Sequence, residues 1–116
     1  MEQIPVFDLT QLLQSACDDR ETASAVVALF LEEVPTQLAQ LDRALAAGDS
    51  PTAERMAHSI KGSSAAIGGL MLRDVAFRGE KLGREGKLDD LRLLLPELRQ
   101  CFDDLSCQLR SLDFQL

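Results

Sequence analysis

Apolar residues recur at intervals of three and four along nearly the whole chain, without the strict alternation that marks a half-buried strand. This spacing gives each segment one apolar face and predicts an all-α protein. The longest stripe lies within 21–47 and comprises Ala23, Val27, Phe30, Leu31, Val34, Leu38, Leu41 and Leu45. The chain has no Trp or Tyr. Its core must therefore be mainly aliphatic, which also favours packed helices.

Start and stop signals divide the chain into five expected helices, at about 9–17, 21–47, 51–67, 70–84 and 88–112. The start signals are the capping residues Asp8 and Asp49, and the stop signals are Gly48, Gly68 and Gly86. At Pro35 we expect a kink rather than an end, because the apolar stripe continues beyond it. Short connections make neighbouring helices antiparallel. We therefore predict an antiparallel up-down four-helix bundle, with the short N-terminal helix covering one end.

Composition narrows the classes of function. The chain of 116 residues is expected to form one domain, residues 1–116, and its net charge of −7 argues against binding to nucleic acid or anionic membranes. No apolar run approaches the ~20 residues that span a bilayer. The N-terminus has no basic region followed by an apolar one, so no signal peptide is expected and the protein is predicted to be cytoplasmic.

The three cysteines, Cys17, Cys101 and Cys107, do not suggest a disulfide framework, because their number is odd and their spacing irregular. We expect them to be small buried residues of a reducing compartment. With a single histidine in the chain, no metal site is expected.

Charge is unevenly distributed along the chain. Residues 55–88, called here the basic segment, carry a net charge of +4, whereas residues 1–54 carry −8 and residues 89–116 carry −3. Such a segment would complement an acidic partner and speed their encounter.

His58, the single histidine, lies on the helix expected at 51–67. At ~100° per residue, Ala53, Met56, Ile60 and Ile67 fall on the opposite face, so the imidazole is expected to point to solvent. Most lone histidines have no special function. The surroundings of His58 favour one, because Arg55 and Lys61 add positive charge on the same face. Gly62, which costs about 1 kcal/mol relative to Ala within a helix, leaves open space one turn away.

The segment Ala57-His58-Ser59-Ile60-Lys61-Gly62-Ser63-Ser64-Ala65-Ala66-Ile67-Gly68 resembles the signature of histidine phosphotransfer (HPt) domains. Leu72, Glu80 and the run from Gly83 to Gly86 resemble the next helix of that family, and the whole chain is most similar to stand-alone proteins of the HptB type. Gly79 departs from the family pattern, which has an apolar residue there. It either loosens the fourth helix or lets a neighbour approach closely.

The resemblance implies that His58 accepts a phosphoryl group, that Lys61 stabilises its charge, that Gly62 provides clearance and that Ser63 helps to order the site. Lys61 is also expected to be an exposed charge that contributes little to folding. Arg55 is either a contributor to the site or an ordinary solvated charge.

The predicted function is a phosphorelay intermediate between receiver domains. It would take the phosphoryl group from a receiver aspartyl phosphate of a hybrid sensor kinase and pass it to the receiver of a response regulator. The chain has no phosphate-cradling loop, so we expect no ATP site, no autokinase activity and no cofactor of its own, with Mg²⁺ held by the partner receiver. We expect a monomer. The alternative is a helical module that binds receivers and regulates them without transferring phosphate. Leu29, which lies off its stripe, either covers the first helix or joins a docking surface.

Overall fold

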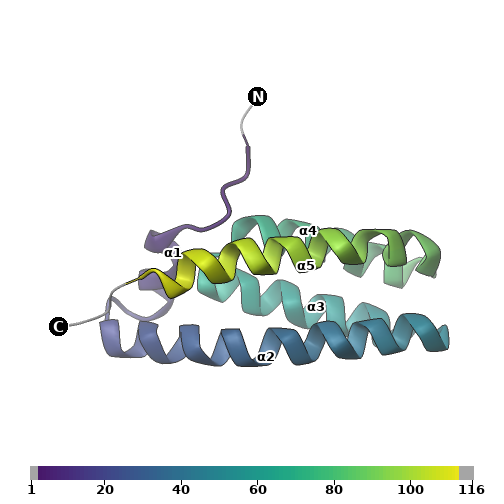
Figure 1. Cartoon of the computed structure of the whole chain (residues 1–116), viewed down its shortest axis with the longest axis horizontal. Coiled ribbons are helices and arrows are strands. Elements are labelled where there is room, and N and C mark those ends of the chain that lie inside the picture. Colours follow the sequence, from purple (N-terminus) through teal and green to yellow (C-terminus); the bar gives the residue numbers. More distant parts are fainter. Residues whose placement is uncertain (1–2, 113–116) are drawn as a thin grey trace.

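Four long helices lie side by side in an elongated bundle, and a short first helix lies at one end (Figure 1). This computed structural model describes residues 3–112. The helices are α1 (Leu9–Ser15), α2 (Arg20–Ala47), α3 (Ser50–Ile67), α4 (Leu70–Arg84) and α5 (Leu88–Arg110). Within residues 3–112 there is no strand, so the prediction of an all-α bundle is confirmed. No helix in this part of the chain has the length and apolar character needed to cross a bilayer.

The helix ends follow the capping chemistry expected from the sequence. The Asp8 carboxylate accepts hydrogen bonds from the backbone N–H groups of Thr10 and Gln11, and the Asp49 carboxylate accepts one from that of Thr52. Gly48 and Gly68 end α2 and α3 in the left-handed conformation, with φ of 68° and 80°.

Helices α2 and α3 each begin one residue earlier than predicted, and two helix ends differ by two residues. Helix α1 ends at Ser15 rather than Cys17, because Cys17 and Asp18 adopt positive φ angles of 54° and 58°. Helix α5 ends at Arg110 rather than Leu112.

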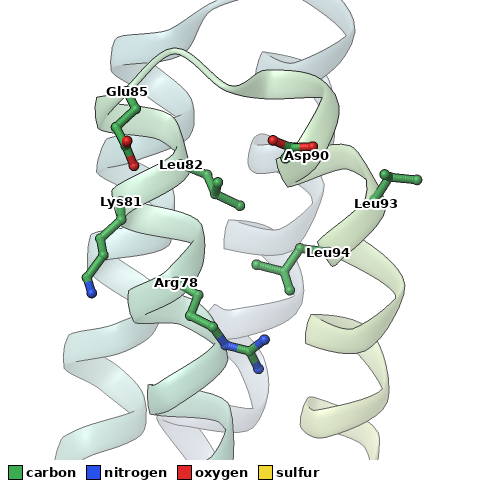
Figure 2. A pocket seen from close by; sticks show the side chains of 7 residues that line it. All are labelled: Arg78, Lys81, Leu82, Glu85, Asp90, Leu93 and Leu94. Atoms are coloured by element: carbon green, nitrogen blue, oxygen red, sulfur yellow. The ribbon is translucent and has the colours of Figure 1, made fainter.

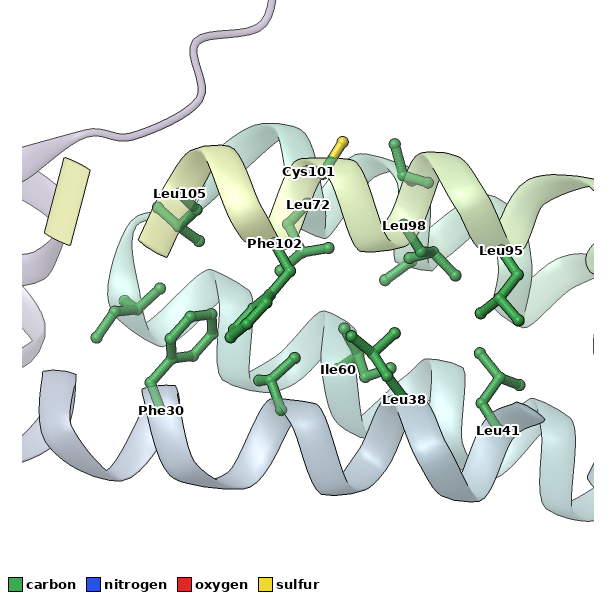
Figure 3. Packing of buried hydrophobic residues seen from close by; sticks show 14 of the residues in the cluster. Phe30, Leu38, Leu41, Ile60, Leu72, Leu95, Leu98, Cys101, Phe102 and Leu105 are labelled. Atoms are coloured by element: carbon green, nitrogen blue, oxygen red, sulfur yellow. The ribbon is translucent and has the colours of Figure 1, made fainter. Parts of the chain in front are cut away.

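The core is a continuous aliphatic layer with a pair of aromatic rings (Figure 3). Phe30 of α2 and Phe102 of α5 face each other with ring centroids 5.8 Å apart. The predicted stripe on α2 is buried except for the half-buried Leu31, and the helix continues through Pro35. Leu29 is 54% exposed, so more than half of it faces solvent.

Two glycines let α4 pack closely against its neighbours. A Cβ atom at Gly79 would lie 3.1 Å from Cδ1 of Leu91 on α5, so this glycine permits close approach. A Cβ atom at Gly83 would lie only 2.9 Å from the backbone Cα and N of Glu54 on α3. Near the end of α4, Gly83 is therefore buried against α3, whereas the preceding Leu82 is only partly buried. This packing places the α4 side chains directly beside those of α3.

The expectation that all three cysteines are buried was wrong for two of them. Cys101 is buried in the core, where desolvation raises the pKa of its thiol. Cys17 is exposed in the turn after α1, and Cys107 is exposed on the outer face of α5.

Candidate functional site

His58 projects from the outer face of α3, with 63% of its side chain exposed. The opposite face of the helix carries the fully buried Ala53, Ile60 and Ile67, while Met56 is half-buried. The helical spacing thus predicted the direction of the imidazole correctly.

Glu80 of α4 is the immediate partner of the imidazole. Its carboxylate Oε2 lies 2.7 Å from Nδ1 of His58, and its Oε1 accepts a hydrogen bond of 2.6 Å from Nζ of Lys61. The guanidinium of Arg84, one turn further along α4, lies 3.6 Å from Oε2. Only 6% of the Glu80 side chain is exposed, so a buried carboxylate holds an exposed histidine.

The charge of Glu80 determines which ring nitrogen of the neutral His58 carries the proton and which keeps its lone pair. Burial raises the pKa of this carboxyl, but the hydrogen bonds from Lys61 and His58 outweigh burial, so the pKa lies below its usual value. Glu80 is therefore ionised at neutral pH and can only accept hydrogen bonds. In the neutral imidazole, Nδ1 must then carry the proton, which leaves the lone pair on Nε2.

Lys61 is more constrained than a surface lysine. Its side chain is only 28% exposed, and its ammonium both pairs with Glu80 and lies 5.1 Å from the ring centroid of Phe77. The expectation that the Lys61 side chain is exposed was therefore wrong. A cation one turn from His58 and close to the same carboxylate is well placed to meet negative charge on the imidazole.

Gly62 is exposed, one turn after His58 on α3. A Cβ atom added there would meet nothing within 4 Å. Packing within the chain therefore gives no reason for glycine at this position, in contrast to Gly79 and Gly83. The absence of a side chain at Gly62 leaves the surface beside His58 open.

The other two residues singled out in the sequence, Arg55 and Ser63, make no hydrogen bond or ion pair with the Glu80 carboxylate within residues 3–112. Arg55 donates a hydrogen bond of 3.4 Å to Thr52 within α3, and it lines a surface hollow of about 400 Å³ between α2 and α3. Ser63 is half-buried on the flank of α3. Its neighbour Ser64 is fully buried and donates a hydrogen bond of 2.6 Å to the carbonyl of Ile60.

Sequence reasoning did not identify Glu80 or Arg84 as part of the site. The available signal was the position of Glu80 on the inner face of its helix, between the buried Ala76 and Gly83. A carboxylate at such a position requires partners, and the nearest candidates were the cationic and imidazole groups of the preceding helix. Among residues 3–112, no group of three His, Cys, Asp or Glu residues could hold a metal ion.

Comparison with known proteins shows the family and the fold of the chain. The sequence pattern of the Hpt domain matches residues 25–107. The chain belongs to the Hpt domain family. The family prediction made from the motif around His58 is therefore confirmed.

Two similar proteins were found. "Multistep phosphorelay regulator 1" of Schizosaccharomyces pombe is 37% identical over 79 residues, which cover 67% of this chain and 26% of that protein. The chain thus spans about a quarter of the length of this relative. The crystal structure of histidine-containing phosphotransfer protein B (HptB) from Pseudomonas aeruginosa PAO1 has the same fold, with a TM-score of 0.87. It is 23% identical, and the match covers 94% of this chain and 95% of that one.

Membership of the Hpt family supports phosphotransfer as the general function of the domain.

Proposed function

We propose that this chain is a phosphorelay intermediate that carries a phosphoryl group on Nε2 of His58. It would accept the group from the aspartyl phosphate of a hybrid sensor kinase receiver and pass it to the receiver aspartate of a response regulator. The observation that carries the proposal is the hydrogen bond between Nδ1 of His58 and the buried, ionised Glu80. This bond orients an exposed imidazole with its nucleophilic nitrogen toward an incoming partner.

The proposed step exchanges one bond to phosphorus for another. The lone pair of Nε2 attacks the phosphorus of the aspartyl phosphate, an N–P bond forms, and the P–O bond to the aspartate breaks. The bonding electron pair leaves with the aspartate carboxylate. The proton on Nδ1 stays between His58 and Glu80, and the reverse sequence delivers the group to the next receiver.

Neighbouring residues support this step in different ways. Lys61, whose ammonium lies beside the site, would turn from Glu80 toward the phosphoryl oxygens and neutralise part of their charge. Gly62 would keep the approach to Nε2 open. Ser63 and Arg55 have smaller roles in the proposal. Ser63 would help to order the site, and Arg55 would attract an acidic partner.

The proposal includes no nucleotide chemistry in this chain. The sequence lacks a phosphate-cradling loop, so the donor in this proposal is another protein rather than ATP. The Mg²⁺ of the transfer would be held by the acidic pocket of the partner receiver. We further propose that the chain acts as a monomer in the cytoplasm.

The test is incubation of the purified chain with receiver domains from its own organism, each phosphorylated with ³²P-labelled acetyl phosphate. We expect label on this chain that is stable to alkali, labile to acid, mapped to His58 and lost in His58→Gln. Binding of phosphorylated receivers without any label on the chain would favour the alternative, a regulatory module that does not transfer phosphate. Label that persists in His58→Gln would disprove the assignment of the residue.

A second reaction checks the source of the phosphoryl group. Labelled ATP and Mg²⁺ without a kinase should leave the chain unlabelled. Labelling of His58 under these conditions would contradict the absence of autokinase activity.

A further inference from the structure

Phe77 is the one aromatic residue among the large apolar side chains that lie exposed in residues 3–112. It is 40% exposed, although it lies on α4 only one turn before the buried Glu80. It is not part of the hydrophobic core of the bundle. Burial therefore does not explain an aromatic ring at this position.

Two ammonium groups lie over the Phe77 ring. Nζ of Lys61, on α3, is 5.1 Å from the ring centroid, and Nζ of Lys81, on α4 itself, is 4.3 Å from it. The face of an aromatic ring attracts a cation that lies within about 6 Å of the centroid. Both lysines therefore make a cation–π contact with the same ring.

The two lysines differ in what else they contact. Lys81 lies one turn after Phe77 on the same helix, and its side chain extends along α4 toward the preceding turn (Figure 2). Lys61, by contrast, also donates a hydrogen bond to Glu80, the carboxylate that holds His58. The contact with Lys61 thus links the ring of Phe77 to the phosphoacceptor site.

We propose that Phe77 is a positioning residue for phosphoryl transfer, whose ring holds the ammonium of Lys61 at the phosphoacceptor site. The ring acts through Lys61 and does not touch the phosphoryl group. This inference rests on the proposed function, in which Lys61 turns from Glu80 toward the phosphoryl oxygens. It gives a role to an exposed ring that lies outside the motif around His58.

The ring is needed at the moment when Lys61 leaves Glu80. A lysine side chain is long and flexible, so holding its ammonium in one place costs conformational entropy. In the resting site two contacts hold this ammonium, the hydrogen bond to Glu80 and the ring of Phe77. During transfer the bond to Glu80 breaks, and the contact with the ring is the one that remains.

An aromatic ring suits this role better than a second carboxylate. A carboxylate would occupy an N–H donor of the ammonium and neutralise its charge. The face of a ring attracts the cation but carries no net charge, so the positive charge and the N–H donors stay available to phosphoryl oxygens. Only 28% of the Lys61 side chain is exposed, which limits competition from water.

The experiment compares Phe77→Leu, which keeps an apolar side chain but removes the ring, with Phe77→Tyr, which keeps the ring. The donor is phosphoramidate, a small molecule that releases ammonia as its phosphoryl group passes to Nε2 of His58. Contact with a receiver therefore plays no part, and labelling is followed by intact mass. Lys81→Ala is the control for the other ammonium on the ring.

We expect Phe77→Leu to slow labelling by about two- to fivefold, the size of a cation–π contact at a partly exposed site. Phe77→Tyr and Lys81→Ala should label at the wild-type rate. A normal rate in Phe77→Leu overturns the inference, and so does an equally slow rate in Phe77→Tyr. If Lys81→Ala is as slow as Phe77→Leu, the ring acts through Lys81 and the inference is also overturned.

A double-mutant cycle tests whether the effect passes through Lys61. Once Lys61 is replaced by alanine, the ring has no ammonium to hold at the site. Phe77→Leu should therefore cause no further loss of rate in the Lys61→Ala background. The same two- to fivefold loss in both backgrounds would show that Phe77 acts independently of Lys61, contrary to the inference.

A spectroscopic readout follows Lys61 directly and needs no phosphoryl transfer. In the proton NMR spectrum, the ring current of Phe77 should shift the ε-methylene protons of Lys61 upfield. This shift should disappear in Phe77→Leu and persist in Phe77→Tyr, and the signal is assigned by its absence from Lys61→Ala. Unshifted protons in the wild type overturn the inference.

Failure of the proposed function gives a different pattern. If neither phosphoramidate nor a phosphorylated receiver labels His58 in the wild type, the proposed function fails and the positioning role falls with it, even where the ring-current shift is present. If Phe77→Leu slows labelling by a receiver but not by phosphoramidate, Phe77 is a contact of the partner and its role through Lys61 is overturned.

Discussion

Nδ1 of His58 and Oε2 of Glu80 lie 2.7 Å apart, across the contact between α3 and α4. In the proposed transfer, the exposed His58 supplies the nucleophile and the buried Glu80 fixes the proton on the other ring nitrogen. The close packing of α4 at Gly79 and Gly83 brings the carboxylate within reach of the ring. The reactivity proposed for the site therefore depends on the packing of the bundle as well as on the motif around His58.

Replacement of Glu80 by glutamine tests whether the carboxylate activates the imidazole. Glutamine keeps the shape of the side chain but loses its charge, so the hydrogen bonds to charged groups, each about 1.5–3 kcal/mol, are weakened. We expect transfer from a phosphorylated receiver to slow by about ten- to hundredfold. The measurement is single-turnover transfer, which separates the chemical step from docking.

The control for Glu80→Gln is the affinity for the receiver, which should stay within twofold of the wild-type value because Glu80 is buried. A normal rate of phosphoryl transfer at saturating receiver would show that Glu80 is only a structural partner of Lys61.

The sequence predicted the fold well because its helical signals agree with one another. The stripe on α2, the caps at Asp8 and Asp49 and the glycine at 48 all point to the same boundaries, and each acts within a few residues of its own position. The direction of His58 could be predicted for the same reason, since it depends only on the geometry of one helix.

The partners of His58 could not be predicted with the same certainty, because they depend on contacts between helices. Glu80 lies 22 residues from His58, and whether it reaches the ring depends on how closely α3 and α4 pack. The wrong expectation for Lys61 has the same origin, since its burial comes from Glu80 and Phe77 of α4. Arg55 lies on the face of α3 toward α2. It is close to His58 in the sequence, but it does not bond to the Glu80 carboxylate.

Gly62→Gln tests the clearance proposed at the site. The structure has open space for a side chain at this position, so the fold should be retained and gain up to about 1 kcal/mol in unfolding free energy. Transfer from a receiver should be lost, because the new side chain lies one turn from His58 in the path of the partner. The measurements are urea denaturation and receiver-driven labelling, and normal labelling would rule out clearance as the role of Gly62.

Gly83→Ala and Gly62→Ala form a matched pair, the same change at two helical glycines. At Gly83 the new Cβ would lie 2.9 Å from backbone atoms of Glu54, which cannot move aside easily, so we expect destabilisation by about 1–3 kcal/mol. At Gly62 we expect stabilisation of up to about 1 kcal/mol, from the higher helix propensity of alanine. Urea denaturation of both variants checks the pair, and equal effects of the same sign would contradict the close packing of α3 and α4.

Lys61→Ala should impair both transfer and stability. Its removal leaves the buried Glu80 without one of its hydrogen-bond donors, at a cost of about 1–3 kcal/mol in unfolding free energy. Transfer should slow at every salt concentration, because the ammonium acts next to the phosphoryl group. Arg55→Ala is the comparison, with a smaller effect on transfer that fades as salt screens the basic segment. Unchanged melting of Lys61→Ala would show that its contact with Glu80 contributes nothing to the fold.

The pH dependence of stability gives an independent test of the ionised Glu80. Its pKa in the folded protein is lowered, despite burial, by the hydrogen bonds from Lys61 and His58. The stability that this carboxylate contributes is therefore fully present above the pKa of an unfolded glutamate, about 4.3, and is lost as the pH falls through that value toward the folded pKa. The Glu80→Gln variant lacks the ionisable carboxyl at position 80, whereas the wild type and the variant share all other carboxyl groups. The difference in unfolding free energy between wild type and Glu80→Gln should thus be constant from pH 7 to about pH 5 and shrink below that. Urea denaturation at a series of pH values measures it, and a difference that grows toward acid pH would mean that burial, rather than hydrogen bonding, controls the charge of Glu80.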